Sequence, residues 1–382
     1  MKKQIILSFI FFTLLNYAQA QETGVVKEIY LKSPSVDLNI LGDTTSKKVL
    51  IYLPPSYKDS NKKYPVVYFL TGYGTEVDII FDQGLKLNKF LDKKAKSGEI
   101  NEMIMVVATS KIRLNYSKLE HSPYTWGAFY VNSEVTGNWD TFLADELVNY
   151  IDSNYRTIPN RESRAITGHS MGGLGAITIG FNHPDIYGTI YSISAGIIGV
   201  DDLETSWMFA TDDEKNKSID LINKLSLPNA DLNDYKKSLT EFIEDDTIFN
   251  GNVILSFAYG SAFMDNTKLN PPYFNYPFER KNGKIVKNNK VWNEWNNRLT
   301  NYKTLIDNYK SKNIQIDNIV LEFGTNDNNK LTQGNPAFSI LLNNNKIPYE
   351  FKYFAGGHGD LLPRLQDNMF PYLSKKICVF GN

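Results

Sequence analysis

The sequence predicts an α/β fold built on a mostly parallel, doubly wound sheet. Short runs of β-branched and other apolar residues recur along the chain, and amphipathic helical patterns fall between several of them. Strands of this kind that alternate with helices are typical of a parallel sheet that is buried on both faces. The strands are expected at residues 49–53, 66–70, 104–108, 163–167, 189–194, 319–323 and 351–354.

Three stretches predict helices from the spacing of their apolar residues. One begins near Trp139, where Asp140 is expected to cap the N-terminus. The other two helices are expected within residues 85–96 and 363–377. The apolar stripe of the first helix consists of Phe142, Leu143, Leu147, Val148 and Ile151.

Residues 200–315 separate two expected strands by too great a length for a simple crossover connection. We therefore expect an insertion within one catalytic domain that spans residues 21–382. An insertion at this point would lie beside the edge of the sheet where active sites form, and it could act as a cap. The aromatic run within residues 270–274 could line the rim of a pocket, and packing in the core is an equally good explanation.

The N-terminus has the pattern of a secretory signal peptide that spans residues 1–20. Two lysines are followed by an apolar stretch at residues 5–15, which is too short to cross a bilayer as a helix. The sequence Ala18-Gln19-Ala20 is a small-x-small cleavage site, so the mature chain is expected to begin at Gln21. This predicts a periplasmic or secreted protein without stable membrane insertion after cleavage. The alternative is a buried N-terminal strand.

Composition excludes several classes of function. The formal net charge of the 382 residues is −1, so no overall field would attract nucleic acid. Cys378 is the only cysteine, which excludes an internal disulfide. The sequence contains no His and Cys cluster with metal-binding spacing, so we expect neither a metal nor another cofactor.

The sequence Gly-His-Ser-Met-Gly at residues 168–172 lies between an expected strand and a helical run of small residues. A strand, a sharp turn and a helix form the context of a nucleophile elbow. The flanking glycines let the chain turn tightly, so that the hydroxyl of Ser170 projects above the sheet. The alternative is a glycine-rich turn that carries an ordinary serine.

A nucleophilic serine needs a base, and the chain has four histidines. His358 lies in a glycine-rich loop after the alternating run at residues 349–354, where it could reach a neighbouring active site. The sharp turn is expected to point His169 elsewhere, and His183 is expected to end the helix after the elbow. His121 lies in a polar loop. The alternative for His358 is a surface histidine.

The acid that orients the base should follow a strand between serine and histidine. Asp327 leaves the carboxyl end of the expected strand at residues 319–323. Glu322 lies inside that strand, and Asp360 is too close to the histidine in the chain to orient its ring. The order of serine, aspartate and histidine is that of α/β-hydrolases. The alternative for Asp327 is a simple Asx-turn.

An oxyanion hole is expected where the strand at residues 66–70 leads into Thr71-Gly72-Tyr73-Gly74. The backbone N–H groups of Tyr73 and of Met171, which follows the nucleophile, could hold a tetrahedral oxyanion. The alternative is a glycine turn without a catalytic role.

The chain resembles the putative-esterase family of α/β-hydrolases. This family includes S-formylglutathione hydrolases, feruloyl and acetylxylan esterases of carbohydrate esterase family 1, enterobactin-type esterases and mycolyltransferases. The resemblance is most specific around the nucleophile, where residues 164–173 read Arg-Ala-Ile-Thr-Gly-His-Ser-Met-Gly-Gly. It extends over residues 49–57, 64–74, 137–196, 324–327 and 356–358.

This resemblance implies an α/β-hydrolase fold in which Ser170 is the nucleophile, His358 the base and Asp327 the acid. It also implies that Tyr73 and Met171 provide the oxyanion donors. The chain departs from many members at Thr71, where they have histidine.

We expect an exported serine carboxylesterase whose substrate is a small-molecule or polysaccharide-linked ester, such as a feruloyl or acetyl group on a polysaccharide. Siderophore-ester hydrolysis and acyl transfer to an acceptor other than water are alternatives with the same chemistry. S-formylglutathione hydrolysis is disfavoured because that thioester is cytosolic. A catalytically silent carbohydrate-binding protein on the same fold is an alternative of a different class.

Overall fold

The computed structural model describes residues 23–43, 46–81, 84–112, 127–225, 231–245 and 250–377. The expected signal peptide at residues 1–20, His121 and Cys378 lie outside these ranges. Export therefore stays a prediction from the sequence. Within the described part of the chain, no helix has the length and apolarity needed to cross a membrane.

An eight-stranded sheet forms the centre of the molecule, with the strand order β1-β2-β4-β3-β7-β8-β11-β12. Neighbours from β4 to β12 run parallel, whereas β2 is antiparallel to both β1 and β4. The predicted mostly parallel, doubly wound sheet is therefore confirmed. The strands are β1 (Val25–Leu31), β2 (Lys47–Leu53), β3 (Val66–Leu70), β4 (Ile104–Ala108), β7 (Arg164–His169), β8 (Thr189–Ile193), β11 (Asn318–Gly324) and β12 (Glu350–Phe354).

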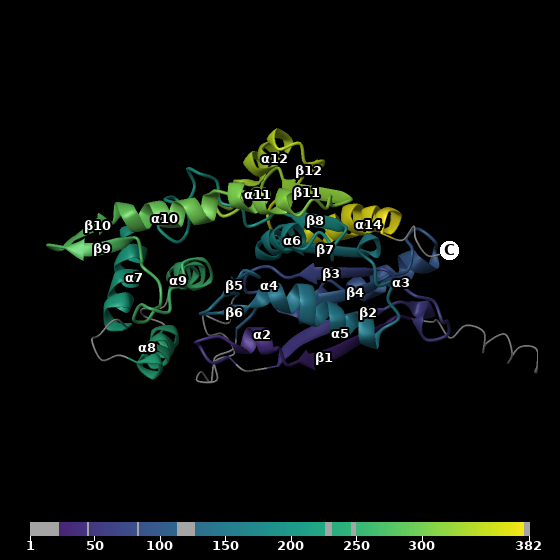
Figure 1. Cartoon of the computed structure of the whole chain (residues 1–382), viewed down its shortest axis with the longest axis horizontal. Helices are drawn as coiled ribbons and strands as arrows, with labels where there is room; N and C mark the ends of the chain where they lie inside the picture. Colours follow the sequence, from purple (N-terminus) through teal and green to yellow (C-terminus); the bar gives the residue numbers. More distant parts are fainter. Residues whose placement is uncertain are drawn as a thin grey trace, which may run out of the picture.

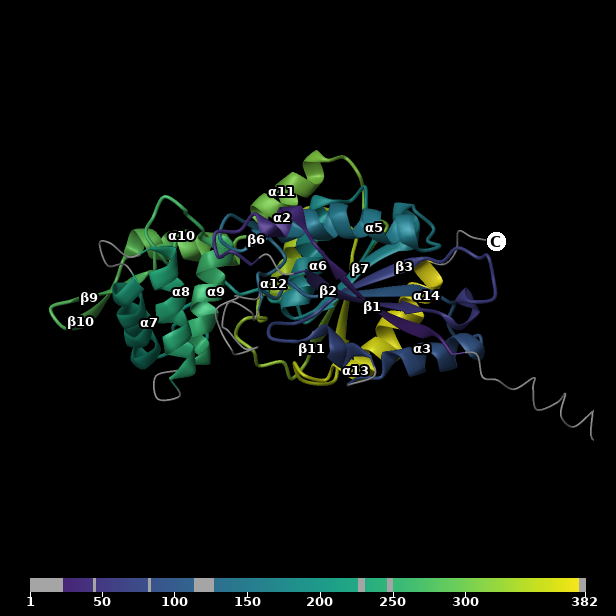
Figure 2. The ribbon, with the colours of Figure 1, turned by 90° about the horizontal axis from the view of Figure 1, so that it is seen from below.

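Helices cover both faces of the sheet. This explains why β3 is apolar at every position. Val66, Tyr68 and Leu70 join one buried cluster, while Val67 and Phe69 join the other, because successive side chains point to opposite faces. Figure 2 shows α5 and α11 on one side of the sheet and α3 and α13 on the other. The helices outside the long connection are α2 (Pro34–Asp37), α3 (Leu87–Lys96), α4 (Trp139–Thr141), α5 (Leu147–Asn154), α6 (Met171–Asn182), α12 (Asn335–Asn344), α13 (Leu361–Pro363) and α14 (Phe370–Lys376).

The helix expected from Trp139 is interrupted by a π-helical turn at Phe142–Glu146 between α4 and α5. The prediction that Asp140 caps it was wrong, because Asn138 holds the capping position. The carboxylate of Asp140 instead accepts a hydrogen bond from Asn182 Nδ2 and contacts His183 Nε2. The buried carboxylate of Asp140 thus interacts with these two partners and does not cap the helix as the sequence suggested.

We call the connection between β8 and β11 the β8–β11 segment, and its described residues form five helices and a hairpin. Figures 1 and 2 show most of it gathered beside the sheet, with the hairpin at the far end. Its elements are α7 (Asp212–Leu225), α8 (Leu232–Glu244), α9 (Gly251–Phe263), β9 (Phe278–Lys281), β10 (Lys284–Lys287), α10 (Asn289–Thr300) and α11 (Lys303–Ser311). A further small hairpin, β5 (Asn132–Ser133) and β6 (Gly137–Asn138), precedes α4.

The β8–β11 segment contributes a group of packed aromatic rings to the buried cluster on one face of the sheet. Phe209 packs within 5.8 Å of the rings of Tyr276, Phe278 and both tryptophans of α10. Phe274, which was a candidate for a pocket rim, is buried and packs edge-on against Phe257 and Trp295. Phe274 also lines a hollow of about 400 Å³ together with Asn270 and Pro272, so it packs in the core and contributes to the wall of a pocket that does not contain Ser170.

Candidate active site

The backbone around Ser170 forms a strained turn between β7 and α6. Ser170 has φ of 57° and ψ of −117°, a conformation that non-glycine residues rarely adopt. A Cβ atom on Gly168 would lie 2.3 Å from the carbonyl oxygen of Gly172, and a Cβ on Gly172 would lie 2.0 Å from that of Leu70. Both flanking glycines are therefore required sterically, and the geometry is that of a nucleophile elbow.

The imidazole of His358 lies beside the hydroxyl of Ser170. His358 Nε2 is 3.0 Å from Ser170 Oγ, although the two residues are far apart in the chain. His358 is in the loop after β12, as expected from the sequence. The distance is within the range that proton transfer from the serine to a base requires.

The carboxylate of Asp327 orients this imidazole from the other side. Its Oδ2 atom accepts a hydrogen bond from His358 Nδ1 at 2.8 Å, and the side chain is completely buried. Its Oδ1 atom accepts from the backbone N–H of Asn329 and the hydroxyl of Thr332. Burial is the largest single influence on Asp327 and raises its pKa. The hydrogen bond and the charge of His358, with the hydrogen bonds from Asn329 and Ser194, together outweigh burial, so the net pKa lies below the ordinary value. Asp327 therefore stays charged and fixes the tautomer in which Nε2 can accept the serine proton.

Tyr73 and Met171 line one pocket together with Ser170 and His358. A Cβ atom on Gly127 would meet both the sulfur of Met171 and the ring of Tyr73, so the two side chains converge there. Met171 is the first residue of α6, where backbone N–H groups have no partner within the helix. This placement is compatible with an oxyanion hole, and the donor roles of the two N–H groups stay a prediction.

His169 does not point away from the site, so the interpretation drawn from the sharp turn was wrong. Its Nε2 atom is 2.8 Å from the backbone carbonyl oxygen of His358, and the two rings lie 4.7 Å apart. Because a carbonyl can only accept, His169 Nε2 carries the proton. Burial, with the neighbouring His358, lowers the pKa of His169 to about 3, so its ring is neutral. No local pattern indicated this contact.

A buried ion pair connects the strand before the acid to the turn after the base. Arg364 and Glu322 are both fully buried, and Arg364 Nε donates to Glu322 Oε1 at 2.8 Å. Arg364 also donates to the hydroxyl of Ser194 and to the backbone carbonyl of Glu322. The sequence indicated that Glu322 was a poor candidate for the acid but did not reveal this partner.

The pocket in front of Ser170 has a volume of about 320 Å³. The β8–β11 segment supplies one wall through Trp207, Asn252, Leu255 and Tyr259. Trp207 is 47% exposed, which is unusual for an indole ring. Among the described residues, no cluster of three His, Cys, Asp or Glu side chains could hold a metal ion.

Comparison with known proteins shows which family this chain matches. The family described as "Putative esterase" matches residues 44–360, which is most of the chain. An esterase of Mycobacterium tuberculosis is 31% identical over 130 residues, which cover 34% of this chain and 25% of that protein. An endo-1,4-beta-xylanase/feruloyl esterase of Xylanibacter ruminicola is 27% identical over 150 residues, 38% of this chain and 19% of that protein. The chain thus spans a quarter or less of the length of these relatives.

The fold also matches a solved structure. A ferulic acid esterase superposes with a TM-score of 0.54 at 19% identity, and the match covers 92% of this chain and 98% of that one. At 19% identity the structural similarity establishes only the fold. Family membership is established by the family match over residues 44–360. The chain therefore belongs to the putative-esterase family.

Proposed function

We propose that this chain is an exported serine carboxylesterase in which Ser170, His358 and Asp327 form the catalytic triad. One observation carries the proposal: the hydroxyl, the imidazole and the buried carboxylate form a continuous hydrogen-bonded chain. It lies at the carboxyl ends of β7, β11 and β12, where α/β folds place their active sites.

The reaction follows from this arrangement. His358 accepts the proton of Ser170 as Oγ attacks the ester carbonyl, and Asp327 stabilises the imidazolium that forms. The N–H groups of Met171 and Tyr73 donate to the oxyanion of the tetrahedral intermediate. The alcohol leaves with the proton from His358, and a water molecule, deprotonated in turn by His358, releases the acid from the serine ester.

The proposed substrate is an acyl group on a polysaccharide, with feruloyl and acetyl as the candidates. The xylanase/feruloyl esterase among the relatives supports a feruloyl ester. The pocket of about 320 Å³, with Trp207 and Tyr259 in its wall, offers flat apolar surface for an aromatic acyl group. The signal peptide pattern supports an encounter with such polymers outside the cytoplasm. The formal charge of −1 provides no overall field that would attract nucleic acid.

Labelling with a fluorophosphonate tests the nucleophile. We expect the wild type and Ser97→Ala to be labelled and Ser170→Ala to remain unlabelled, because Ser97 is an exposed serine at the end of α3. An unlabelled wild type would instead favour a silent carbohydrate-binding protein.

Release assays test the substrate. Feruloyl- and acetyl-xylooligosaccharides are compared with p-nitrophenyl acetate and butyrate, and product analysis with an added alcohol detects acyl transfer. Turnover of the aryl esters alone would contradict the polysaccharide assignment. For export, N-terminal sequencing of the protein recovered from the periplasm or medium is expected to begin at Gln21.

A further inference from the structure

A buried amide joins the loop that carries the acid to the stretch of chain that holds the nucleophile. Asn335 is the first residue of α12 and is 1% exposed. Its Nδ2 atom donates to the backbone carbonyl of Ala195 and to that of Thr332, each at 2.7 Å. Since a carbonyl oxygen can only accept, both N–H groups of the amide are committed and its orientation is fixed. We call this pair of hydrogen bonds the Asn335 clamp.

On one side, the clamp leads to the carboxylate of the triad. The hydroxyl of Thr332 lies 3.0 Å from Asp327 Oδ1, and Thr332 is fully buried. This hydroxyl can also reach the carbonyl oxygen of Asn329, but a charged acceptor forms the stronger bond. The carbonyl that the clamp holds belongs to Thr332 itself, so the clamp fixes the position from which this hydroxyl reaches the carboxylate.

On the other side, the clamp leads to the backbone of the nucleophile. The N–H of Ser170 donates to the carbonyl of Ile193 at 2.9 Å, and its carbonyl accepts from the N–H of Gly196 at 2.8 Å. Ala195, which the clamp holds, lies between these two partners in the chain. The clamp therefore fixes the middle of the stretch to which both backbone groups of Ser170 are bonded.

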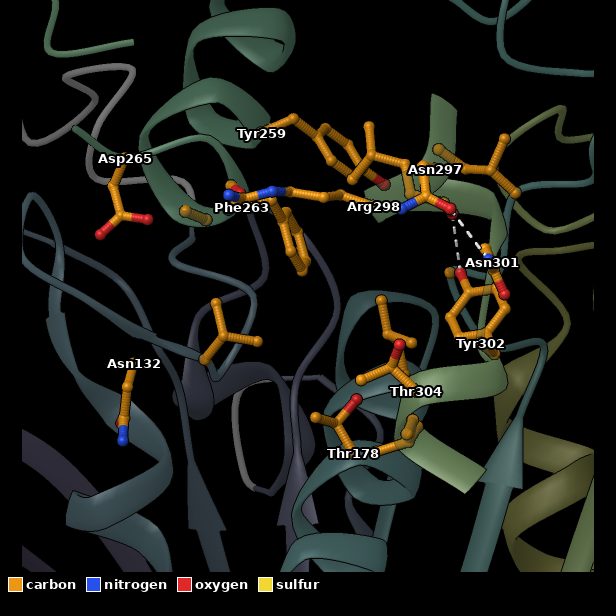
Figure 3. A pocket seen from close by; sticks show the side chains of 17 residues that line it. Asn132, Thr178, Tyr259, Phe263, Asp265, Asn297, Arg298, Asn301, Tyr302 and Thr304 are labelled. Atoms are coloured by element: carbon orange, nitrogen blue, oxygen red, sulfur yellow. Dashed lines mark hydrogen bonds between the residues drawn. The ribbon is translucent and has the colours of Figure 1, made fainter. Parts of the chain in front are cut away.

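This stretch after β8 borders open space on its other sides. Gly196 and Ile198 line a hollow of about 430 Å³, and Figure 3 shows Tyr259 and Thr178 on opposite sides of it. Gly196 also lines the catalytic pocket. Because side chains do not fill the space on these sides, hydrogen bonds to the acid loop and α12 must hold the stretch in place.

A close approach of the two backbones accompanies the clamp. The N–H of Gly334, the residue before Asn335, donates to the carbonyl of Ile197 at 2.8 Å. A Cβ atom on Gly334 would lie 2.8 Å from the carbonyl oxygens of both Ile197 and Ile198. The start of α12 thus lies directly against the stretch after β8, at the distance that the two bonds of Asn335 require.

We propose that Asn335 is a positioning residue of the triad, which sets the separation of Asp327 and Ser170 by joining the acid loop to the stretch that holds the nucleophile. This inference rests on the proposed function and extends it by a residue that does not line the catalytic pocket. Asn335 therefore acts through Thr332 and Ala195 and not through the substrate. The expected consequence is a lower kcat at an unchanged KM, by the same factor for every ester.

The test compares two buried amides with the same bonding pattern. Asn335→Asp keeps the shape of the side chain and removes both N–H donors, because a carboxylate can only accept. Asn39→Asp is the matched control, since Asn39 Nδ2 also donates to two backbone carbonyls, those of Val36 at 2.7 Å and Asp43 at 2.9 Å. Asn39 is 8% exposed and lines neither the catalytic pocket nor the hollow. Urea unfolding measures the stability of both variants, and p-nitrophenyl acetate and butyrate serve as substrates.

In Asn335→Asp, we expect kcat to fall by roughly tenfold on both substrates while KM is unchanged. Asn39→Asp should lose a similar amount of stability and keep the kcat of the wild type. An equal loss of kcat in the two variants, or no loss in Asn335→Asp, would overturn the inference.

Thr332 provides a second test if Asn335→Asp does not fold. Thr332→Val removes the hydroxyl and leaves the carbonyl that the clamp holds, whereas Thr332→Ser retains both. We expect a loss of kcat of roughly tenfold in the first variant and little loss in the second. Equal rates for these two variants would contradict the route through Thr332. A wild type that hydrolyses no ester overturns the esterase function itself, whereas wild-type turnover with unaffected variants overturns this inference alone.

Discussion

The central sheet and the β8–β11 segment differ in how their side chains are buried. The sheet strands β3, β4 and β8 are buried at every position and meet helices on both faces. The β8–β11 segment packs its aromatic rings onto the buried cluster of one sheet face only, and it presents exposed side chains such as Trp207 to the pocket. The sheet therefore holds the triad in place, and the β8–β11 segment shapes the pocket in front of it.

This comparison has a direct kinetic consequence. Changes to the triad and its supports should affect every ester, because they act on the reacting atoms or on their geometry. Changes in the β8–β11 segment should affect the choice of ester, because this segment contacts the substrate away from the bond that breaks.

The largest effect is expected for Asp327→Asn, since an amide can hold His358 in the wrong tautomer. We expect kcat to fall by on the order of 10⁴-fold for all esters. Asp317→Asn is the matched control, because Asp317 lies at the opposite end of β11 in an exposed pair with Arg161. Similar losses in both variants would show that the effect comes from the strand and not from the triad.

The same substitution has a pH dependence with a definite sign. The folded state holds the pKa of Asp327 below the ordinary value of 3.8, so the unfolded chain binds the proton more readily. The stabilisation is complete above that ordinary value and is lost as the pH falls through the lowered one. Unfolding free energies measured against pH should show this acid loss in the wild type and not in Asp327→Asn.

The next largest effect should come from the buried ion pair. Arg364→Met leaves the carboxylate of Glu322 buried without its cation, which costs about 3–5 kcal/mol of stability. Urea unfolding measures this loss. The double variant Arg364→Met, Glu322→Gln removes the uncompensated charge and should recover part of it. No recovery would mean that packing, and not charge, explains the loss.

A smaller effect is expected at His169, which acts through His358 as a positioning residue. His169→Leu removes one hydrogen bond to the His358 carbonyl, worth about 1 kcal/mol, so kcat should fall roughly fivefold with KM unchanged. His169→Gln retains an N–H donor and should restore most of the rate. Equal rates for the two variants would contradict a role for this hydrogen bond.

His169 also predicts how stability varies with pH. Its pKa falls from 6.5 to about 3 on folding, so the unfolded chain binds the additional proton between these values. The wild type should lose stability as the pH drops from about 6.5 towards about 3, and His169→Leu should lose less. Chemical unfolding of both proteins across this range measures the difference.

The smallest and most selective effect is expected in the β8–β11 segment. Trp207→Ala removes an aromatic contact worth about 1 kcal/mol, which should raise KM for feruloyl esters several-fold while acetyl esters are unaffected. Steady-state kinetics on the two ester series provide the measurement. A loss shared by both series would place Trp207 among the supports of the triad and weaken the division between the two regions.

Local sequence patterns predicted most strands of the sheet and the three residues of the proposed triad. The alternation of apolar runs and helical periodicity predicted the sheet, and all seven predicted strands are present. The strand β1 was missed because it is an edge strand with mostly exposed or half-buried positions, which leaves no continuous apolar run. The glycines around Ser170 and the order of serine, aspartate and histidine indicated three residues that the fold brings together.

The sequence by itself determined the fold class and the identity of these three residues, because both depend on short patterns whose spacing is set by strand and helix geometry. Only the tertiary structure decided that His169 meets the His358 carbonyl, that Arg364 pairs with Glu322, and that residues of α6, α9, α10 and α11 line one hollow. These contacts join side chains that are far apart in the chain, and their formation depends on how whole elements pack against one another.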